Sequence, residues 1–275
     1  MESPMTEETT SIDWIRRISG YFTQQDLLII LVLAVIAFLT ASFGLSHILP
    51  GGGGSSFVHG FLKMPGPGAG IFISSAFTCV WLVLGLLLIK KPGTAILMSL
   101  LIIVFSLLMS LTRTGNVRLD YLALVVAIII ECAGILPLEK KPWKFIFPTI
   151  VSLMGLLTLA LMLTGNAKMG ESGAAATVFP LGYAVSGILA IAIGVILWTY
   201  PQSKYIIGAG CAEVFYIVFC WMFNGKSGFA TWVPVVPAIP ALLTFSFVCG
   251  AVMAAIAYGA YLLWNTYAVQ GAEKV

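Results

Sequence analysis

Charge is scarce in this sequence. Only 9% of the 275 residues are Asp, Glu, Lys or Arg, whereas a soluble domain has about 25%. So little charge leaves too little polar surface to face water, which excludes a soluble protein and makes the lipid bilayer the expected surroundings. The net charge of +3 is small, and binding to nucleic acid requires a clustered basic face. Nucleic acid is therefore not an expected partner.

Groups of metal ligands are also missing. The five cysteines stand singly in apolar runs without a Cys-x-x-Cys pair, so neither a disulfide framework nor a zinc site is expected. His47 and His59 flank a tetraglycine; a metal ion between them is the less favoured alternative, because no third ligand lies near. The tetraglycine lacks the Lys-Ser/Thr of a phosphate-binding loop. Without a set of His with Asp, Ser or Glu, we predict no resident metal, no cofactor and no enzyme activity.

Long apolar runs dominate what is present. Hydrophobic residues make up 60% of the chain, and a helix needs about 20 apolar residues to cross a membrane. Barrel strands alternate between apolar and polar residues, so continuous runs of this length exclude them. The sequence therefore predicts an all-α fold, a polytopic membrane helix bundle of about eight transmembrane helices. The eight segments are 26–49, 70–89, 94–112, 119–138, 145–164, 179–200, 204–223 and 238–264.

The distribution of Lys and Arg predicts the orientation of the bundle. With the N-terminus inside, nine of the 14 basic residues fall on inner segments and five on outer ones, so both termini are expected in the cytoplasm of a multi-pass plasma-membrane protein. Residues 1–25 form the predicted cytoplasmic polar tail, with an amphipathic surface helix over 11–25. The bundle covers 26–265, and 266–275 form a cytoplasmic tail. Residues 1–10 are polar and acidic, so no cleavable signal peptide is expected.

Two acidic residues fall deep inside predicted helices. Glu131 lies about 12 residues, or ~18 Å, from the outer end of its segment, and Glu213 about nine residues, or ~14 Å, from the inner end of its own. A charge at that depth costs on the order of 3 kcal/mol. Each carboxyl therefore needs a reason to be there. We predict a substrate or proton site; the alternative is an interhelical hydrogen bond that holds the bundle together.

Three further residues enter the predicted site or an interface. Tyr216 follows Glu213 by one helical turn, so the two can share a face, and Tyr216 is expected to contact ligand. Ala37 and Ala41 form a small-residue pair that lets another helix approach closely. That helix belongs either to this chain or to another subunit.

Several of these residues carry a family resemblance. The pair Ala37-x-x-x-Ala41, the segment Lys91-Pro92-Gly93-Thr94-Ala95 and Glu131 together resemble the substrate-binding S components of energy-coupling-factor vitamin transporters, thiamine-precursor type. The resemblance covers about half the chain, mainly 26–137. It implies a pocket that opens outward, a transmembrane coupling subunit that contacts Ala37 and Ala41, and ATPases as partners. Because the chain has no nucleotide-binding motif, another protein must supply ATP hydrolysis.

The predicted function is small-molecule uptake by a membrane transport protein or permease subunit, with a vitamin or other heterocycle among the candidate substrates. Glu131, Glu213 and Tyr216 would line the pocket, and the glycine- and proline-rich outer loops would gate it. The alternative is a non-transporting subunit that scaffolds or anchors a larger membrane complex. The small-residue faces and the low polar content of the predicted helices favour that second function.

Overall fold

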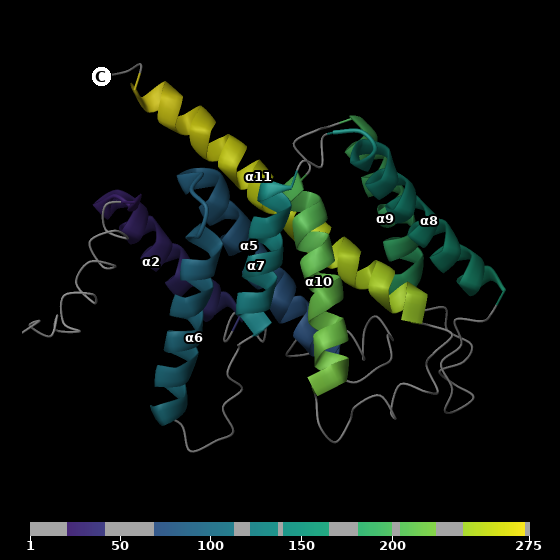
Figure 1. Ribbon diagram of the computed structural model, residues 1–275, viewed down its shortest axis with the longest axis horizontal. Coiled ribbons are helices and arrows are strands. Elements are labelled where there is room, and N and C mark those ends of the chain that lie inside the picture. Colours follow the sequence, from purple (N-terminus) through teal and green to yellow (C-terminus); the bar gives the residue numbers. More distant parts are fainter. Residues whose placement is uncertain are drawn as a thin grey trace, which may run out of the picture.

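The computed structural model describes residues 21–41, 69–112, 122–136, 140–164, 181–199, 204–223 and 239–272. Within these ranges the chain forms eight α-helices and no strand (Figure 1). The all-α class is therefore confirmed for the described residues, and each of the eight predicted segments overlaps one helix. The helices are α2 (Gln24–Leu39), α5 (Ala69–Ile89), α6 (Thr94–Thr112), α7 (Leu122–Ile135), α8 (Trp143–Leu163), α9 (Leu181–Thr199), α10 (Lys204–Phe223) and α11 (Ile239–Ala272).

The helix ends follow the polar punctuation of the sequence. Thr23 caps α2, because its side chain accepts from the N–H of Asp26 while the Asp26 carboxylate accepts from the N–H of Thr23. The α5–α6 turn contains Gly93 at φ 89°, a backbone conformation that glycine adopts without steric cost. Helix α11 extends beyond its predicted bounds and continues to Ala272 through most of the predicted C-terminal tail, whereas α2 ends at Leu39, before the predicted end at 49.

Two of the helices are long and apolar enough in their described parts to cross a membrane by themselves. They are 143–163 in α8 and 239–267 in α11. Other helices have shorter described apolar stretches, among them 24–39 in α2 and 94–109 in α6. Length and composition thus support membrane association of the chain.

One end of the bundle gathers the described lysines, and we call it the lysine end (upper side of Figure 1). The start of α2 meets the α5–α6 turn there, since Lys91 pairs with Asp26. The first residue of α10 joins it, because Lys204 donates to the carbonyl oxygen of Gly134 near the end of α7. The last part of α11 reaches the same end and continues beyond it. The lysines are Lys90, Lys91, Lys140, Lys141, Lys144 and Lys204.

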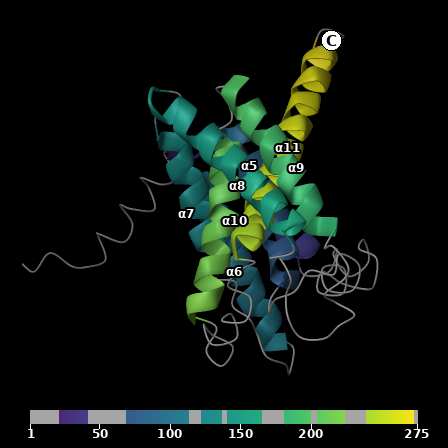
Figure 2. The same ribbon diagram turned by 90° about the vertical axis from the view of Figure 1, so that its right-hand side faces the viewer.

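Helices α5, α10 and α11 pack together in the middle of the bundle, with α7 against α10. Small residues allow this close packing: a Cβ at Gly208 would come within 2.6 Å of the Ala133 side chain. Helices α8 and α9 form a hairpin on one side, lying side by side in Figure 2. There a Cβ at Gly155 would meet the Gly187 carbonyl oxygen at 2.6 Å. Glycine and alanine therefore set the distances between neighbouring helices.

Candidate functional site

Glu131 reaches from α7 to the first turn of α6. Its carboxylate accepts hydrogen bonds from the backbone N–H groups of Gly93 at 2.5 Å, Ala95 at 2.7 Å and Ile96 at 3.2 Å. The first N–H groups of a helix have no partner within the helix, and they carry the positive end of its dipole. A carboxylate suits this position because its oxygens accept from the N–H groups and its negative charge faces the positive end of the dipole. Glu131 thus acts as an N-terminal cap supplied by a different helix.

The position of this cap corrects the expected depth of Glu131. Its partners belong to the α5–α6 turn, so the carboxylate lies at the lysine end rather than midway along the bundle. The side chain is nevertheless buried. The hydrogen bonds match the interhelical alternative raised from the sequence, while a role for Glu131 in binding substrate stays a prediction.

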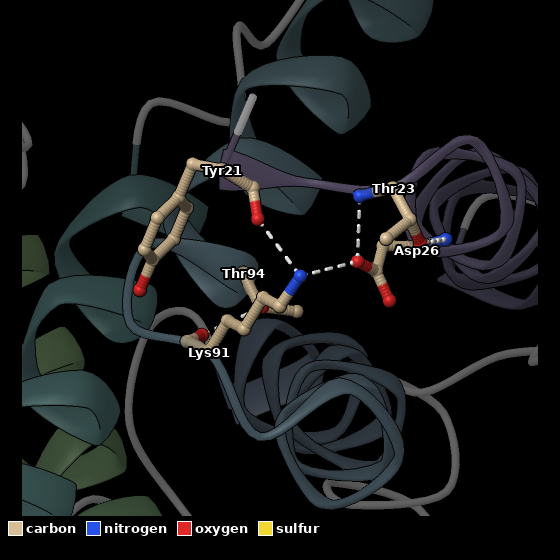
Figure 3. Close-up of polar contacts among 5 residues, drawn as sticks. All are labelled: Tyr21, Thr23, Asp26, Lys91 and Thr94. Atoms are coloured by element: carbon tan, nitrogen blue, oxygen red, sulfur yellow. Dashed lines mark hydrogen bonds and ion pairs between the residues drawn. The ribbon is translucent and has the colours of Figure 1, made fainter. Parts of the chain in front are cut away.

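Polar contacts around this turn join the N-terminal helix to the rest of the bundle. Lys91 Nζ donates to the Asp26 carboxylate at 2.7 Å and to the backbone carbonyl oxygen of Tyr21 at 2.8 Å. Figure 3 shows the ammonium group between these two oxygens, with the Thr94 hydroxyl donating to the Lys91 carbonyl oxygen. This set of contacts was not predicted from the sequence. Asp26 and the basic turn are separated by 65 residues, so only the fold brings them together.

Glu213 lies wholly inside the bundle and makes a different kind of contact. It is 0% exposed, and its Oε1 accepts from the Ser75 hydroxyl at 2.8 Å and from the Cys79 thiol at 3.2 Å. Ser75 and Cys79 are four residues apart on α5 and therefore share one helix face. Neither residue is among those predicted from the sequence. Their signal was a pair of polar side chains four residues apart, in a segment that also holds Ser74 and Thr78.

The third helix around Glu213 approaches at a glycine. A Cβ at Gly250 in α11 would overlap the carbonyl oxygen of Ala209 and come within 2.7 Å of the Glu213 Cγ. The carboxylate of α10 is thus enclosed by α5 on one side and by α11 on the other. A larger residue at position 250 would force these helices apart.

Tyr216 follows Glu213 on α10 and is also buried, at 5% exposed. It belongs to the same apolar cluster as Leu82 of α5 and Ala254 of α11. The structure therefore brings Tyr216 into the centre of the bundle, one helical turn from the carboxylate, as the spacing predicted. Contact of Tyr216 with a ligand stays a prediction.

The two acids do not share a set of partners. Glu131 binds backbone N–H groups of the α5–α6 turn and α6, whereas Glu213 binds side chains of α5. Along α10, Tyr205 packs beside Gly134 near the Glu131 cap, and Glu213 lies eight residues further on, which is ~12 Å along the axis. The structure therefore assigns the two acids to two local sites.

The small-residue pair, Ala37 in α2 and Ala41 just after its end, packs partly within the chain. Ala37 is fully buried in the main apolar cluster, and α2 packs against α5 and α6. Close by, Trp81 Nε1 of α5 donates to the Thr40 hydroxyl at 2.9 Å. Ala41 is partly exposed. The face that carries Ala37 thus contacts this chain's own helices, and an interface with another subunit stays a prediction.

Some predicted features lie outside the described residues. They are the surface helix before Tyr21, His47 and His59, and the glycine- and proline-rich outer loops. Within the described ranges, no group of three or more His, Cys, Asp or Glu side chains has the arrangement of a metal site.

Comparison with known proteins adds no family to this picture. The chain matches no protein-family model, no curated protein and no solved structure.

Proposed function

We propose that this protein is a polytopic membrane transport protein, a permease subunit for small-molecule uptake, in which Glu213 is the functional carboxylate. The observation that supports it is an acid that is 0% exposed within an apolar helix bundle and is held by the Ser75 hydroxyl and the Cys79 thiol. An ionisable residue inside a membrane bundle is costly, and such residues usually mark substrate, ion or proton pathways.

The surface of the bundle supports the membrane part of this proposal. Among the described side chains, the exposed Trp and Tyr residues all lie at or beyond the lysine end, whereas many of the exposed Leu, Ile and Val residues lie along the helices away from that end. Trp and Tyr gather where a membrane meets water, and lysines favour the cytoplasmic side. The lysine end is then cytoplasmic. The aromatic residues are Tyr21, Trp143, Trp198, Trp264 and Tyr267.

The same end holds the start of α2 and the end of α11. In the proposed orientation the described chain therefore enters and leaves on the cytoplasmic side, in agreement with the predicted topology. A cysteine scan at Gln25 and Asn265, with a thiol reagent that does not cross membranes, tests this orientation. In intact cells both positions are expected to be protected, and labelling of either from outside contradicts the proposal.

The donors around Glu213 suit a site that exchanges partners. A Ser hydroxyl and a Cys thiol can each rotate away from the carboxylate and leave its oxygen for a ligand donor. Tyr216 is one turn away and offers an aromatic ring and a hydroxyl. The proposed substrate is accordingly a small molecule with hydrogen-bond donors on a flat heterocycle. The resemblance to the vitamin transporters adds a coupling subunit and ATPases as the proposed source of energy.

Binding measured on purified protein tests the role of Glu213. We expect thiamine or one of its heterocyclic precursors to raise the Tm of the wild type in detergent. Glu213→Gln should weaken that binding at least about tenfold, because a hydrogen bond to a charged group contributes about 1.5–3 kcal/mol. Tyr216→Phe should weaken it less.

Glu131→Gln is the matched control, since it also replaces a buried acid by its amide. If Glu131 acts only as the cap of α6, the folded fraction of this variant should bind as the wild type does; weaker binding would instead support its predicted role in the substrate site. Equal affinity of the wild type and Glu213→Gln for a bound compound removes Glu213 from the site.

A scaffold or anchor subunit is the second candidate function. It is favoured by the close packing of Gly250 and Ala209 beside Glu213, because such packing suits a rigid structural core. Purification from native membranes separates the two functions. A stoichiometric complex without an ATPase favours the scaffold, whereas copurification with an ATPase favours transport.

A further inference from the structure

Three exposed lysines cluster on the connection between α7 and α8. Lys140, Lys141 and Lys144 lie within five residues of one another and are all exposed. Trp143 and Phe145 alternate with them and are 46% and 51% exposed. The segment 139–144 contains one acid, Glu139, so its formal charge is +2. We call these three lysines the α7–α8 lysine patch.

The other three lysines of the lysine end are engaged by the protein. Lys91 binds the Asp26 carboxylate and the Tyr21 carbonyl oxygen. Lys204 donates to the Gly134 carbonyl oxygen, and Lys90 lies 5.7 Å from the centre of the Tyr261 ring. In the patch, Lys141 lies 6.0 Å from the Phe145 ring, which is itself exposed. The α7–α8 lysine patch therefore directs its charge toward the surroundings of the bundle.

An exposed apolar stripe begins directly beside this patch. It runs down α8 at the spacing of one helix face, and its members are 38–57% exposed. Fourteen residues separate its ends, which corresponds to ~21 Å along the helix. Half of a ~30 Å hydrocarbon layer is ~15 Å, so the stripe is long enough to cover an acyl chain. The stripe consists of Trp143, Ile146, Ile150, Leu153 and Leu157.

Cations at one end of a long apolar stripe match a molecule with an anionic head and an apolar chain. We propose that the α7–α8 lysine patch binds the headgroup of an anionic phospholipid, whose acyl chain lies along the exposed face of α8. Lysines next to a membrane surface attract anionic lipids, and each lysine raises the affinity for them about fivefold. This inference rests on the membrane bundle of the proposed function and is independent of transport.

Native mass spectrometry of the full chain tests the inference. The protein is reconstituted with an equal mixture of phosphatidylglycerol and phosphatidylcholine and released into mild detergent. We expect the wild type to retain phosphatidylglycerol at least about fivefold more often than phosphatidylcholine. In K140Q/K141Q/K144Q the ratio of retained phosphatidylglycerol to phosphatidylcholine should fall toward one, because the attraction is electrostatic. In K140R/K141R/K144R it should persist, since the charge is kept.

The outcomes that overturn the inference are distinct from those that overturn the proposed function. Retention of phosphatidylglycerol by the glutamine variant at the wild-type level overturns lipid binding at the patch. An equal loss in the arginine variant overturns the electrostatic basis. Release of the wild type from cell membranes by an alkaline carbonate wash would instead refute the membrane bundle, and unchanged ligand binding in Glu213→Gln would refute the transport site alone.

Discussion

Glu131 and Glu213 are both buried acids in apolar helices, but their surroundings differ. Glu131 binds three backbone N–H groups at the start of α6. Glu213 binds the side chains of Ser75 and Cys79. Backbone donors are part of a helix and cannot turn away, whereas hydroxyl and thiol donors can. We propose on this basis that Glu131 serves the structure of the bundle and Glu213 serves ligand exchange.

The largest expected effect is the loss of the Glu131 cap. Glu131→Ala should lower the free energy of unfolding by about 3–5 kcal/mol, because three N–H groups lose a charged acceptor inside the protein. Thermal and denaturant unfolding in detergent measures the change. Glu131→Gln should cost about half as much, since Oε1 can still accept from Ala95 and Ile96. A fully stable Glu131→Ala variant would contradict the assignment of this acid to structure.

The packing around Glu213 predicts the next effect. Gly250→Ala should destabilise the protein by about 1–3 kcal/mol, because its Cβ overlaps the backbone of Ala209, which cannot rotate away. Gly259→Ala in the same helix is the control, since a Cβ there meets nothing within 4 Å. It should be neutral or stabilising by up to about 1 kcal/mol. Equal effects at the two positions would argue against the close approach of α11 to α10.

Glu213→Gln tests the comparison from the other side. The amide keeps an oxygen that can accept hydrogen bonds from Ser75 and Cys79, so the free energy of unfolding should change by about 1 kcal/mol or less. The variant should therefore unfold close to the wild type while losing ligand binding, the reverse of what is expected for Glu131→Gln. The free energy of unfolding and the ligand affinity, both measured on Glu213→Gln and on Glu131→Gln, distinguish the two roles. A Glu213→Gln variant as unstable as Glu131→Ala would place both acids in the structural class.

The smallest effect is expected at the contact between α2 and the α5–α6 turn. Lys91→Met removes an ion pair whose side chains are 31% and 16% exposed, and partly exposed pairs contribute little because water screens them. The free energy of unfolding of Lys91→Met should therefore differ from that of the wild type by less than the change expected for Glu213→Gln. The difference should shrink further at 0.5 M salt. A large loss that is insensitive to salt would mean that the Tyr21 carbonyl contact dominates.

Much of the fold could be predicted from local sequence. All eight described helices begin within three residues of their predicted segments, and α7 agrees to within three residues at both ends, because apolar runs and Pro/Gly turns act over short range. The contacts of Glu131 with Gly93 and of Glu213 with Ser75 could not be predicted from local sequence, because 38 and 138 residues separate the partners. Only the packing of helices decides which distant donors meet each carboxyl.

The sequence by itself therefore determined the helical class, the number of described helices and the end at which the lysines gather. These follow from hydrophobicity and charge, which are properties of each segment alone. Tertiary structure decided that one acid caps a helix while the other lies among side-chain donors. That difference depends on geometry between segments, because a carboxylate's role is set by the donors within hydrogen-bond distance of it.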